Sequence, residues 1–314
     1  MASSRDRYLR FAEEAVGRSP AYVALAEAVA DDQAILSFLG TLPHEKSQPN
    51  LLFAAACDLL GQPADIEQLR GLVSECPSEL AREMVLRHTQ TNEPARCATL
   101  LPALAQLPQP LALIEVGASA GLTLLFDKYS YDYDGHRIAG LDPDAPVLRC
   151  GVTGPVPLPD RVPEIVWRAG LDLNPLDVTS DEDMRWLACM VWPGEGDRLD
   201  RLAAAIATAR RDRPRLLRGD LRTDLPALAA TAPADATLVV FHTAVLNYLP
   251  RPDREQFAKT MAGLHCVWLS NEAPGVTGDI VPSSRDMHNF LLIRDGSTLM
   301  ASTDSHGTGV QWLI

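Results

Sequence analysis

Apolar side chains in the first hundred residues follow helical spacing. Tyr8, Phe11 and Ala15 recur every three or four positions, as on one face of a helix. The apolar segment 51–60 ends at Gly61-Gln62-Pro63, a typical helix stop. Other helices are predicted over 22–29, 64–73, 79–88 and 95–107. No strand pattern occurs before residue 110, so the chain is predicted to begin with a helical lobe, or lid, over 1–107.

After residue 107, apolar runs of strand length alternate with helical segments. The first run is LALIEV, at 111–116. Similar runs lie at 165–171, 215–218, 237–241 and 266–270. This alternation indicates βαβ units and a mostly parallel sheet. Short runs over 289–313, broken by Asp295-Gly296, predict antiparallel last strands. The predicted fold is α/β, with a Rossmann-like domain over 108–314 that carries an irregular or hairpin insertion at about 130–163.

Composition narrows the class of protein. The chain has 314 residues, 46% of them hydrophobic, so it has enough apolar material for a packed core. Its formal net charge is −13, which argues against a nucleic-acid partner. The six cysteines have no CxxC spacing, so neither a metal site nor a disulfide framework is expected. No apolar run approaches the roughly 20 residues that span a bilayer. We therefore expect a cytoplasmic protein without a membrane partner.

The turn after the first strand is the strongest chemical signal. It reads Glu115-Val-Gly117-Ala118-Ser119-Ala-Gly121, and a helix is predicted over 121–128. Small residues let a ligand approach the backbone, and a helix N-terminus there would offer free N–H groups. The segment resembles the ExGxGxG motif of class I S-adenosylmethionine-dependent methyltransferases, in which the acidic residue receives the methionine ammonium. The resemblance implies that Glu115, Gly117, Ala118, Ser119 and Gly121 bind S-adenosylmethionine. Ordinary packing of a βα turn is the alternative.

Later strand ends fit the same resemblance. Asp172 follows the second strand, where methyltransferases hold ribose, and Asp220 with Leu221 follows the third, where they hold adenine. The fourth strand ends near His242, with Asn247 and Tyr248 just beyond it. In that fold this strand borders the methyl-transfer site. A helix cap for Asp172, a turn acid for Asp220 and a packed histidine for His242 are the structural alternatives.

Longer segments resemble a known family. They are LPHEKSQPNLLFAA (42–55), TQTNEPARCATLLPAL (89–104), IEVGASAGL (114–122), GLDLNPLDV (170–178), VVFHTAVLNYLP (239–250) and WLSNEAPG (268–275). On these strings the chain resembles the bacterial family called domain of unknown function 2332. The resemblance implies a class I methyltransferase-like fold with a helical N-terminal extension. It implies no particular reaction.

Three further groups are candidate site residues. The loop before the helix at 51–60 carries His44 and Glu45 as candidate acid–base groups. Lys46, Gln48 and Asn50 of the same loop are candidate substrate ligands, although Asn50 is equally suited to cap the helix. A second group precedes the first strand and comprises Asn92, Glu93 and Arg96. Glu272 ends the fifth apolar run, and ligands bind at the carboxyl ends of strands in open α/β sheets.

The string Gly117-Ala-Ser119-Ala-Gly121 also matches GxSxG, the nucleophile elbow of α/β hydrolases. That mechanism needs a later acid and a histidine, for which Glu272 with His288 or His306 are available. It leaves Asp172 and Asp220 without a role, so the methyltransferase interpretation is preferred.

The favoured function is an S-adenosylmethionine-dependent methyltransferase acting on a small molecule in bacterial biosynthesis. His242, Glu272, His44 or Glu45 would accept the nucleophile's proton. The first alternative keeps the fold without methyl transfer and catalyses an intramolecular cyclisation or elimination, such as aziridine-type ring closure, with or without a partner subunit. The second is a non-catalytic ligand-binding or scaffold protein. A homo-oligomer is compatible with each.

Overall fold

The computed structural model describes residues 3–276 and 290–314, and the chain divides into two compact units. The helical unit comprises 1–91 and 179–200, and the sheet unit comprises 92–178 and 201–314. This division differs from the expected one at residue 107. Segment 92–107 belongs with the sheet, and 179–200, expected within the sheet domain, belongs with the helices. The sequence periodicity identified the helices without indicating which of them pack together.

The helical unit consists of short helices. They are α1 (Ser4–Ala15), α2 (Pro20–Asp31), α3 (Gln33–Leu39), η1 (His44–Lys46), α4 (Pro49–Leu60), α5 (Ile66–Glu75), α6 (Pro77–Leu86) and α8 (Asp181–Cys189). Local sequence sets several of their ends. Ser3 and Asp6 form a capping box at the start of α1, and Gly61 ends α4 in the left-handed conformation. The aromatic rings of Phe11, Tyr22 and Phe53 pack together in the core of this unit.

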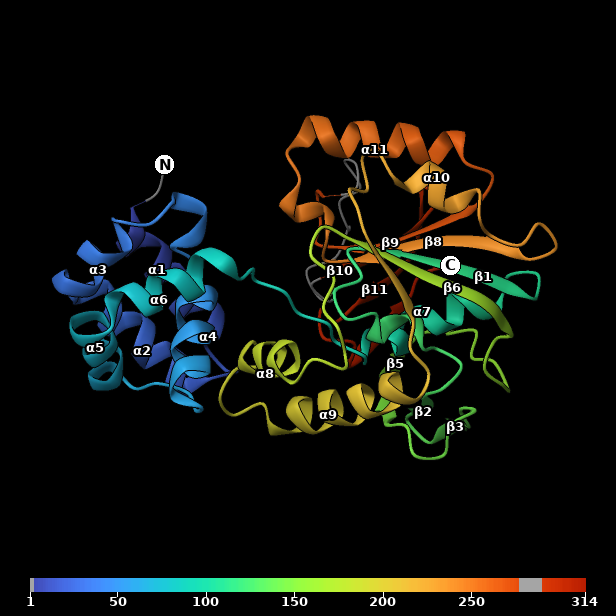
Figure 1. Cartoon of the computed structure of the whole chain (residues 1–314). Helices are drawn as coiled ribbons and strands as arrows, with labels where there is room; N and C mark the ends of the chain where they lie inside the picture. The colour runs from blue at the N-terminus through green and yellow to red at the C-terminus, as the bar shows by residue number, and fades with distance from the viewer. Residues whose placement is uncertain (1–2, 277–289) are drawn as a thin grey trace. The chain divides into compact units, whose positions relative to one another are not determined.

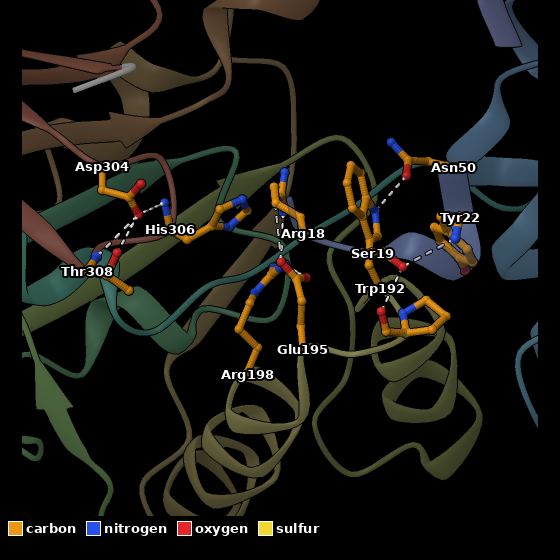
Figure 2. A network of polar contacts seen from close by, with 11 residues as sticks. Arg18, Ser19, Tyr22, Asn50, Trp192, Glu195, Arg198, Asp304, His306 and Thr308 are labelled. Atoms are coloured by element: carbon orange, nitrogen blue, oxygen red, sulfur yellow. Dashed lines mark hydrogen bonds and ion pairs between the residues drawn. The ribbon is translucent and has the colours of Figure 1, made fainter. Parts of the chain in front are cut away.

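Segment 179–200 is tied to the first helices by polar and aromatic contacts, drawn in Figure 2. Glu195 forms an ion pair with Arg18 at 3.0 Å. The Arg18 guanidinium lies 4.1 Å from the Trp192 ring centre. Ser19 donates to the Pro193 carbonyl at 2.7 Å. The indole N–H of Trp192 donates to Asn50 Oδ1 at 3.0 Å. These contacts explain why 179–200 belongs with the helices.

The sheet unit is built on nine strands in the order β5-β12-β11-β10-β9-β8-β1-β6-β7. Their bounds are β1 (Leu111–Val116), β5 (Gly151–Thr153), β6 (Ile165–Asp172), β7 (Arg215–Arg218), β8 (Thr237–Thr243), β9 (Val267–Glu272), β10 (Phe290–Arg294), β11 (Thr298–Thr303) and β12 (Gly309–Trp312). Strands β7, β6, β1, β8 and β9 are parallel, and β10 to β12 are antiparallel to their neighbours in turn. The predicted mostly parallel α/β sheet with antiparallel last strands is therefore confirmed. Asn289, the first residue of the expected finish, lies outside the described residues.

The insertion at 130–163 forms a small second sheet of β2 (Ser130–Tyr133), β3 (His136–Ile138) and β4 (Val147–Arg149). Strand β5 leaves it to pair in parallel with β12 at the edge of the large sheet. The hydroxyls of three buried tyrosines donate to backbone carbonyls at 2.7 Å; these residues are Tyr129, Tyr131 and Tyr133. The expected hairpin insertion is therefore present.

Helices cover both faces of the large sheet (Figure 1). The α10 (Leu225–Ala229) and α11 (Arg251–Gly263) helices lie on one face, where Leu225 and Phe257 pack against β1 and β8. Helix α7 (Arg96–Ala105) lies on the other face, together with the sheet-unit part of α9 (Gly196–Arg211). Side chains alternate between faces along a strand, so each functional residue on β1, β8 or β9 points towards one helix layer or the other.

Candidate functional site

The glycine turn at the end of β1 docks onto the end of β6. The Gly117 N–H donates to the Leu171 carbonyl at 2.8 Å, and the Ser119 N–H donates to Asp172 Oδ2 at 2.8 Å. Gly117 and Gly121 have φ near +71°, and Ser119 has φ 51°. L side chains rarely adopt this region, so the two glycines relieve the strain of the turn and Ser119 bears it.

The helix expected over 121–128 is wrong: only the 3-10 turn η2 (Leu122–Leu124) follows Gly121. Side chains occupy the carbonyls that a helix would use for its own hydrogen bonds. The Tyr129 hydroxyl donates to the Leu122 carbonyl at 2.7 Å. Arg168 donates to the Leu124 carbonyl at 3.2 Å. No α-helix N-terminus therefore faces a ligand at this turn, and the expected dipole contribution is removed.

Glu115, at the carboxyl end of β1, has a buried carboxylate of which only one oxygen is hydrogen bonded. Its side chain is 2% exposed, and Oε1 accepts a short hydrogen bond from the Thr123 hydroxyl. Oε2 is buried and has no hydrogen-bond partner. Burial raises the pKa of Glu115 to about 8, against the opposing hydrogen bond from Thr123. When the carboxyl group is ionised, Oε2 has no hydrogen-bond donor. When Oε2 is protonated, its O–H has no acceptor, so burial costs free energy in either state.

Asn92 supports this carboxylate through Thr123. Its amide donates to the Thr123 hydroxyl at 3.4 Å, and its Oδ1 accepts the Leu122 N–H at 2.8 Å. Asn92 thus orients the Thr123 hydroxyl that donates to Glu115, and it also binds the backbone of the turn at Leu122. Sequence reasoning named Asn92 as a candidate and missed Thr123, which lies on no motif.

The space directly above Gly117 is filled by the protein itself. A Cβ at Gly117 would lie 2.4 Å from Val245 Cγ2. Val245 is held in place because its N–H donates to Glu272 Oε1 at 2.8 Å. The preceding residue, Ala244, has φ 57°. The glycine is thus required by the close approach of the β8–α11 loop.

The two predicted nucleoside acids already have partners. Asp172 accepts the Ser119 N–H at 2.8 Å and the Asn174 N–H at 2.7 Å. Asp220 forms an ion pair with Arg222 at 2.6 Å, and Arg222 also binds Asp253 at 2.8 Å. The hydrogen bond from Arg222 lowers the pKa of Asp220. Of the two structural alternatives at these positions, Asp220 takes the turn-acid role, while Asp172 clamps the glycine turn rather than capping a helix.

Glu93 and Arg96 join distant parts of the sheet unit. Glu93, 4% exposed, pairs with Arg201 of α9 at 2.8 Å. Arg96 donates to the Ser305 carbonyl at 2.8 Å and to the Thr243 carbonyl at 3.2 Å. Both residues therefore have structural partners at the positions where substrate ligands were predicted. Sequence reasoning missed Arg201, Thr243 and Ser305 because nothing in the local sequence identifies a partner so far along the chain.

His242 and Glu272, each predicted as a possible proton acceptor, form a buried hydrogen-bonded pair with each other. The His242 ring is fully buried, and its Nδ1 lies 2.7 Å from Glu272 Oε1. The Trp268 indole donates to His242 Nε2 at 2.9 Å. Since an indole N–H only donates, Nε2 accepts and Nδ1 carries the proton. Neither nitrogen has a free lone pair, so His242 is not a proton acceptor here.

Glu115 and His242 also point to opposite faces of the sheet. Glu115 is in register with Phe241 of β8, so His242, the next residue, points the other way. Ring contacts agree, because Phe241 meets Phe126 on one face and His242 meets Phe257 of α11 on the other. Glu272 shares the face of His242. His242 and Glu272, both predicted as catalytic groups, therefore lie on the other face of the sheet from Glu115.

Asn247 and Tyr248 lie in the 3-10 turn η3 (Leu246–Tyr248), just beyond the carboxyl end of β8. Both are exposed, Tyr248 to 66%. They remain candidate substrate contacts at the strand edge.

One protein-family model matches nearly the whole length of the chain. The model described as "Uncharacterized protein conserved in bacteria (DUF2332)" matches residues 5–312. The chain belongs to this family. No curated protein and no solved structure shows significant similarity to it. The DUF2332 match runs through the helical unit and the sheet unit alike, so both are parts of one family architecture.

In this DUF2332 protein most polar groups of the 44–50 loop have partners inside the helical unit. Lys46 Nζ donates to the Arg87 carbonyl at 2.6 Å, and burial lowers the pKa of Lys46. Gln48 donates to the Glu45 carbonyl at 2.8 Å. Asn50 accepts from Trp192 (Figure 2) instead of capping α4, which begins at Pro49. The loop is thus largely satisfied by its own unit.

Other predicted chemistry receives little support from the geometry. Ser119 Oγ is buried and has no hydrogen-bond partner, so no histidine within the described residues activates it as a hydrolase nucleophile. His288 lies outside the described residues. Within 3–276 and 290–314 no cluster of three or more His, Cys, Asp or Glu residues is placed to hold a metal ion. In the same part of the chain, no helix has the length and apolar character needed to cross a membrane.

Proposed function

We propose that this DUF2332 protein is an enzyme that binds a small metabolite through a cationic amine at Glu115. The observation that carries the proposal is the buried Oε2 of Glu115, which has no partner at the carboxyl end of the central strand β1. Ligands of open α/β sheets bind at this edge. An ammonium group placed there would supply the missing donor and keep the carboxylate ionised.

S-adenosylmethionine is the proposed ligand of this type. Its amino-acid end would meet Glu115 beside the turn at Gly117, and Asp172 has oxygen lone pairs beyond its two backbone bonds for the ribose hydroxyls. The strand order β7-β6-β1-β8-β9 reads 3-2-1-4-5 in chain order, as in doubly wound nucleotide-binding sheets. The adenine end fits less well, because Asp220 is ion-paired with Arg222.

When bound, S-adenosylmethionine supplies an electrophilic methyl group for in-line displacement. The chain's own contribution would then be positioning. Glu115 would fix the amino-acid end, and the exposed Asn247 and Tyr248 would contact the acceptor. His242 is unsuited to take the acceptor's proton, because both of its ring nitrogens are already hydrogen bonded.

A second candidate, cyclisation or elimination without a methyl donor, is favoured by the pKa of Glu115 near 8. A general base works best with a pKa close to the operating pH. Glu115 would take the proton of a substrate ammonium. The freed nitrogen lone pair would form the new C–N bond, and an anionic leaving group would depart with the electrons of the broken bond. The occupied state of Asp220 is no obstacle to this reaction.

Isothermal titration calorimetry with the full chain tests the proposal. The probes are S-adenosylhomocysteine and 5′-methylthioadenosine, which lacks the amino-acid group. Glu115→Gln should weaken S-adenosylhomocysteine by about 10- to 100-fold, the value of a charge-assisted hydrogen bond, and leave methylthioadenosine unchanged. Glu164→Gln, at an exposed site of the same unit, is the matched control.

The outcomes separate the candidates. If neither nucleoside binds the wild-type chain at millimolar concentration, methyl transfer is ruled out and cyclisation remains. If both nucleosides bind and Glu115→Gln weakens neither, the assignment of Glu115 to the ammonium is wrong.

A further inference from the structure

A pocket of about 540 Å³ lies in the helical unit, between α1 and the 44–50 loop. This volume falls within the range typical of small-molecule sites. Its apolar wall includes Phe11 and Pro49, both buried. Charged residues of both signs, including Arg7, Arg10 and Glu14 of α1, complete the lining. The proposed function at Glu115, in the sheet unit, makes no use of this pocket.

The pocket contains two arginines that form no ion pair within the described residues. Arg7 donates from Nη1 to the His44 carbonyl at 2.9 Å and to the Ser47 hydroxyl at 3.0 Å. These neutral acceptors fix the guanidinium in place. Neither Arg7 nor Arg10 makes an ion pair with any described residue, whereas Arg18 and Arg87 of the same unit do. The other terminal nitrogen of Arg7, Nη2, lies 2.7 Å from His44 Nε2, so Arg7 is held against the loop. The exposed guanidinium of Arg10 makes no hydrogen bond within the described residues and matches a carboxylate ligand.

The pocket also contains negative charge without a partner. Glu14 and Glu45 are exposed and line it, and neither makes an ion pair within the described part of the chain. Glu14 lies one helical turn after Arg10 on α1, a spacing that usually allows pairing. The two side chains nevertheless do not meet. Both signs are therefore available to a ligand.

We propose that this pocket binds an α-amino acid in its zwitterionic form. The carboxylate meets Arg10, with the positive charge of Arg7 beside it, the ammonium meets Glu14 and Glu45, and the side chain lies on Phe11. Two acids in the lining disfavour a phosphate or a dianion, because like charges repel. The two arginines disfavour a simple cation for the same reason. Only a ligand with both charges pairs with both sets.

Titration calorimetry of the full chain with each of the twenty L-amino acids tests this proposal. At least one should bind, and its carboxamide and its N-acetyl derivative should each bind about 10- to 100-fold more weakly. Arg10→Gln should remove the preference for the free carboxylate. Glu14→Gln should remove the preference for the free ammonium. Both side chains are exposed and unpaired, so the fold should tolerate each change.

Matched controls lie on the same unit. Arg82→Gln and Glu13→Gln, at exposed positions outside the pocket lining, should leave both preferences intact. Glu115→Gln should also leave them intact, which separates this site from the proposed function. The proposal is overturned if no amino acid binds, or if the N-acetyl derivative binds as well as its parent. It is overturned equally if Arg10→Gln leaves the carboxylate preference unchanged.

Discussion

The indole N–H of Trp268 donates to Nε2 of His242 at 2.9 Å and so decides which ring nitrogen carries the proton. The imidazole must donate from Nδ1, where Glu272 Oε1 accepts at 2.7 Å. That same carboxylate oxygen accepts the N–H groups of Val245 and Leu246. The buried histidine is thus the centre of a network that shapes the loop after β8, and the loop in turn lies against Gly117.

Trp268→Phe should lower the free energy of unfolding by about 1–3 kcal/mol, because a buried acceptor on His242 loses its donor. Urea unfolding measures the change. Trp167→Phe is the control, since the Trp167 indole makes no hydrogen bond within the described structure and its ring is only partly buried. NMR of the wild-type imidazole should find the Nδ1–H tautomer. The Nε2–H tautomer would contradict the assignment.

The pKa of Glu115 makes stability depend on pH. Its folded-state pKa is about 8, above the ordinary value of 4.5. Between these values the folded state binds the proton more tightly than the unfolded state, so the free energy of unfolding falls as the pH rises through this window. One such group contributes a slope of at most about 1.4 kcal/mol per pH unit.

Glu115→Gln mimics the protonated acid and should therefore flatten the decline in the free energy of unfolding between pH 5 and 8. The slope should fall by about the amount that corresponds to one bound proton. Chemical unfolding at several pH values measures it. Glu164→Gln should keep the wild-type slope. Equal slopes in wild type and Glu115→Gln would show that Glu115 is ionised throughout this range.

Features that depend on local sequence were predictable, and those that depend on distant contacts were not. The period of the apolar residues located β1 and β8 and the antiparallel finish. The same pattern wrongly predicted a helix over 121–128, where Tyr129 and Arg168 donate hydrogen bonds to the backbone carbonyls that a helix would use. Propensity is a weak prior that such tertiary contacts override.

In the candidate site, too, local features were predictable from the sequence and distant contacts were not. Glu115 and Gly117 were predictable because the turn itself carries their signal. The roles of His242 and Asp220 depend on Trp268 and Arg222, which no motif links to them. The position of a residue at a strand end therefore indicated that it lies at the carboxyl edge of the sheet, but not on which face its side chain lies.

Gly117→Ala should destabilise the protein more than Gly61→Ala. Both glycines have φ near +71°, so both pay the same backbone strain. A Cβ at Gly117 would lie 2.4 Å from Val245, whereas a Cβ at Gly61 meets nothing within 4 Å. Thermal unfolding should give an excess loss of about 1–3 kcal/mol for Gly117→Ala, the typical cost of overpacking.

Val245→Ala in the Gly117→Ala background should restore part of that excess, because it removes the clashing methyl groups. The coupling of the two changes, taken from a double-mutant cycle, measures the contact. Additive effects would mean that the loop after β8 does not lie on the glycine turn.

Asp220 and Arg222 offer a test of the adenine end of the proposed ligand. The guanidinium binds Asp220 at 2.6 Å and is itself 46% exposed, so solvent screening leaves the pair little weight in stability. If Asp220 receives adenosine, Arg222 competes for it. Asp220→Asn should then weaken 5′-methylthioadenosine, and Arg222→Gln should tighten it, by several-fold each in calorimetry. A structural role alone would give small, similar losses of stability in both variants and no change in affinity. Asp253→Asn, which removes the other partner of Arg222, should leave the affinity near wild type, because it does not release Asp220.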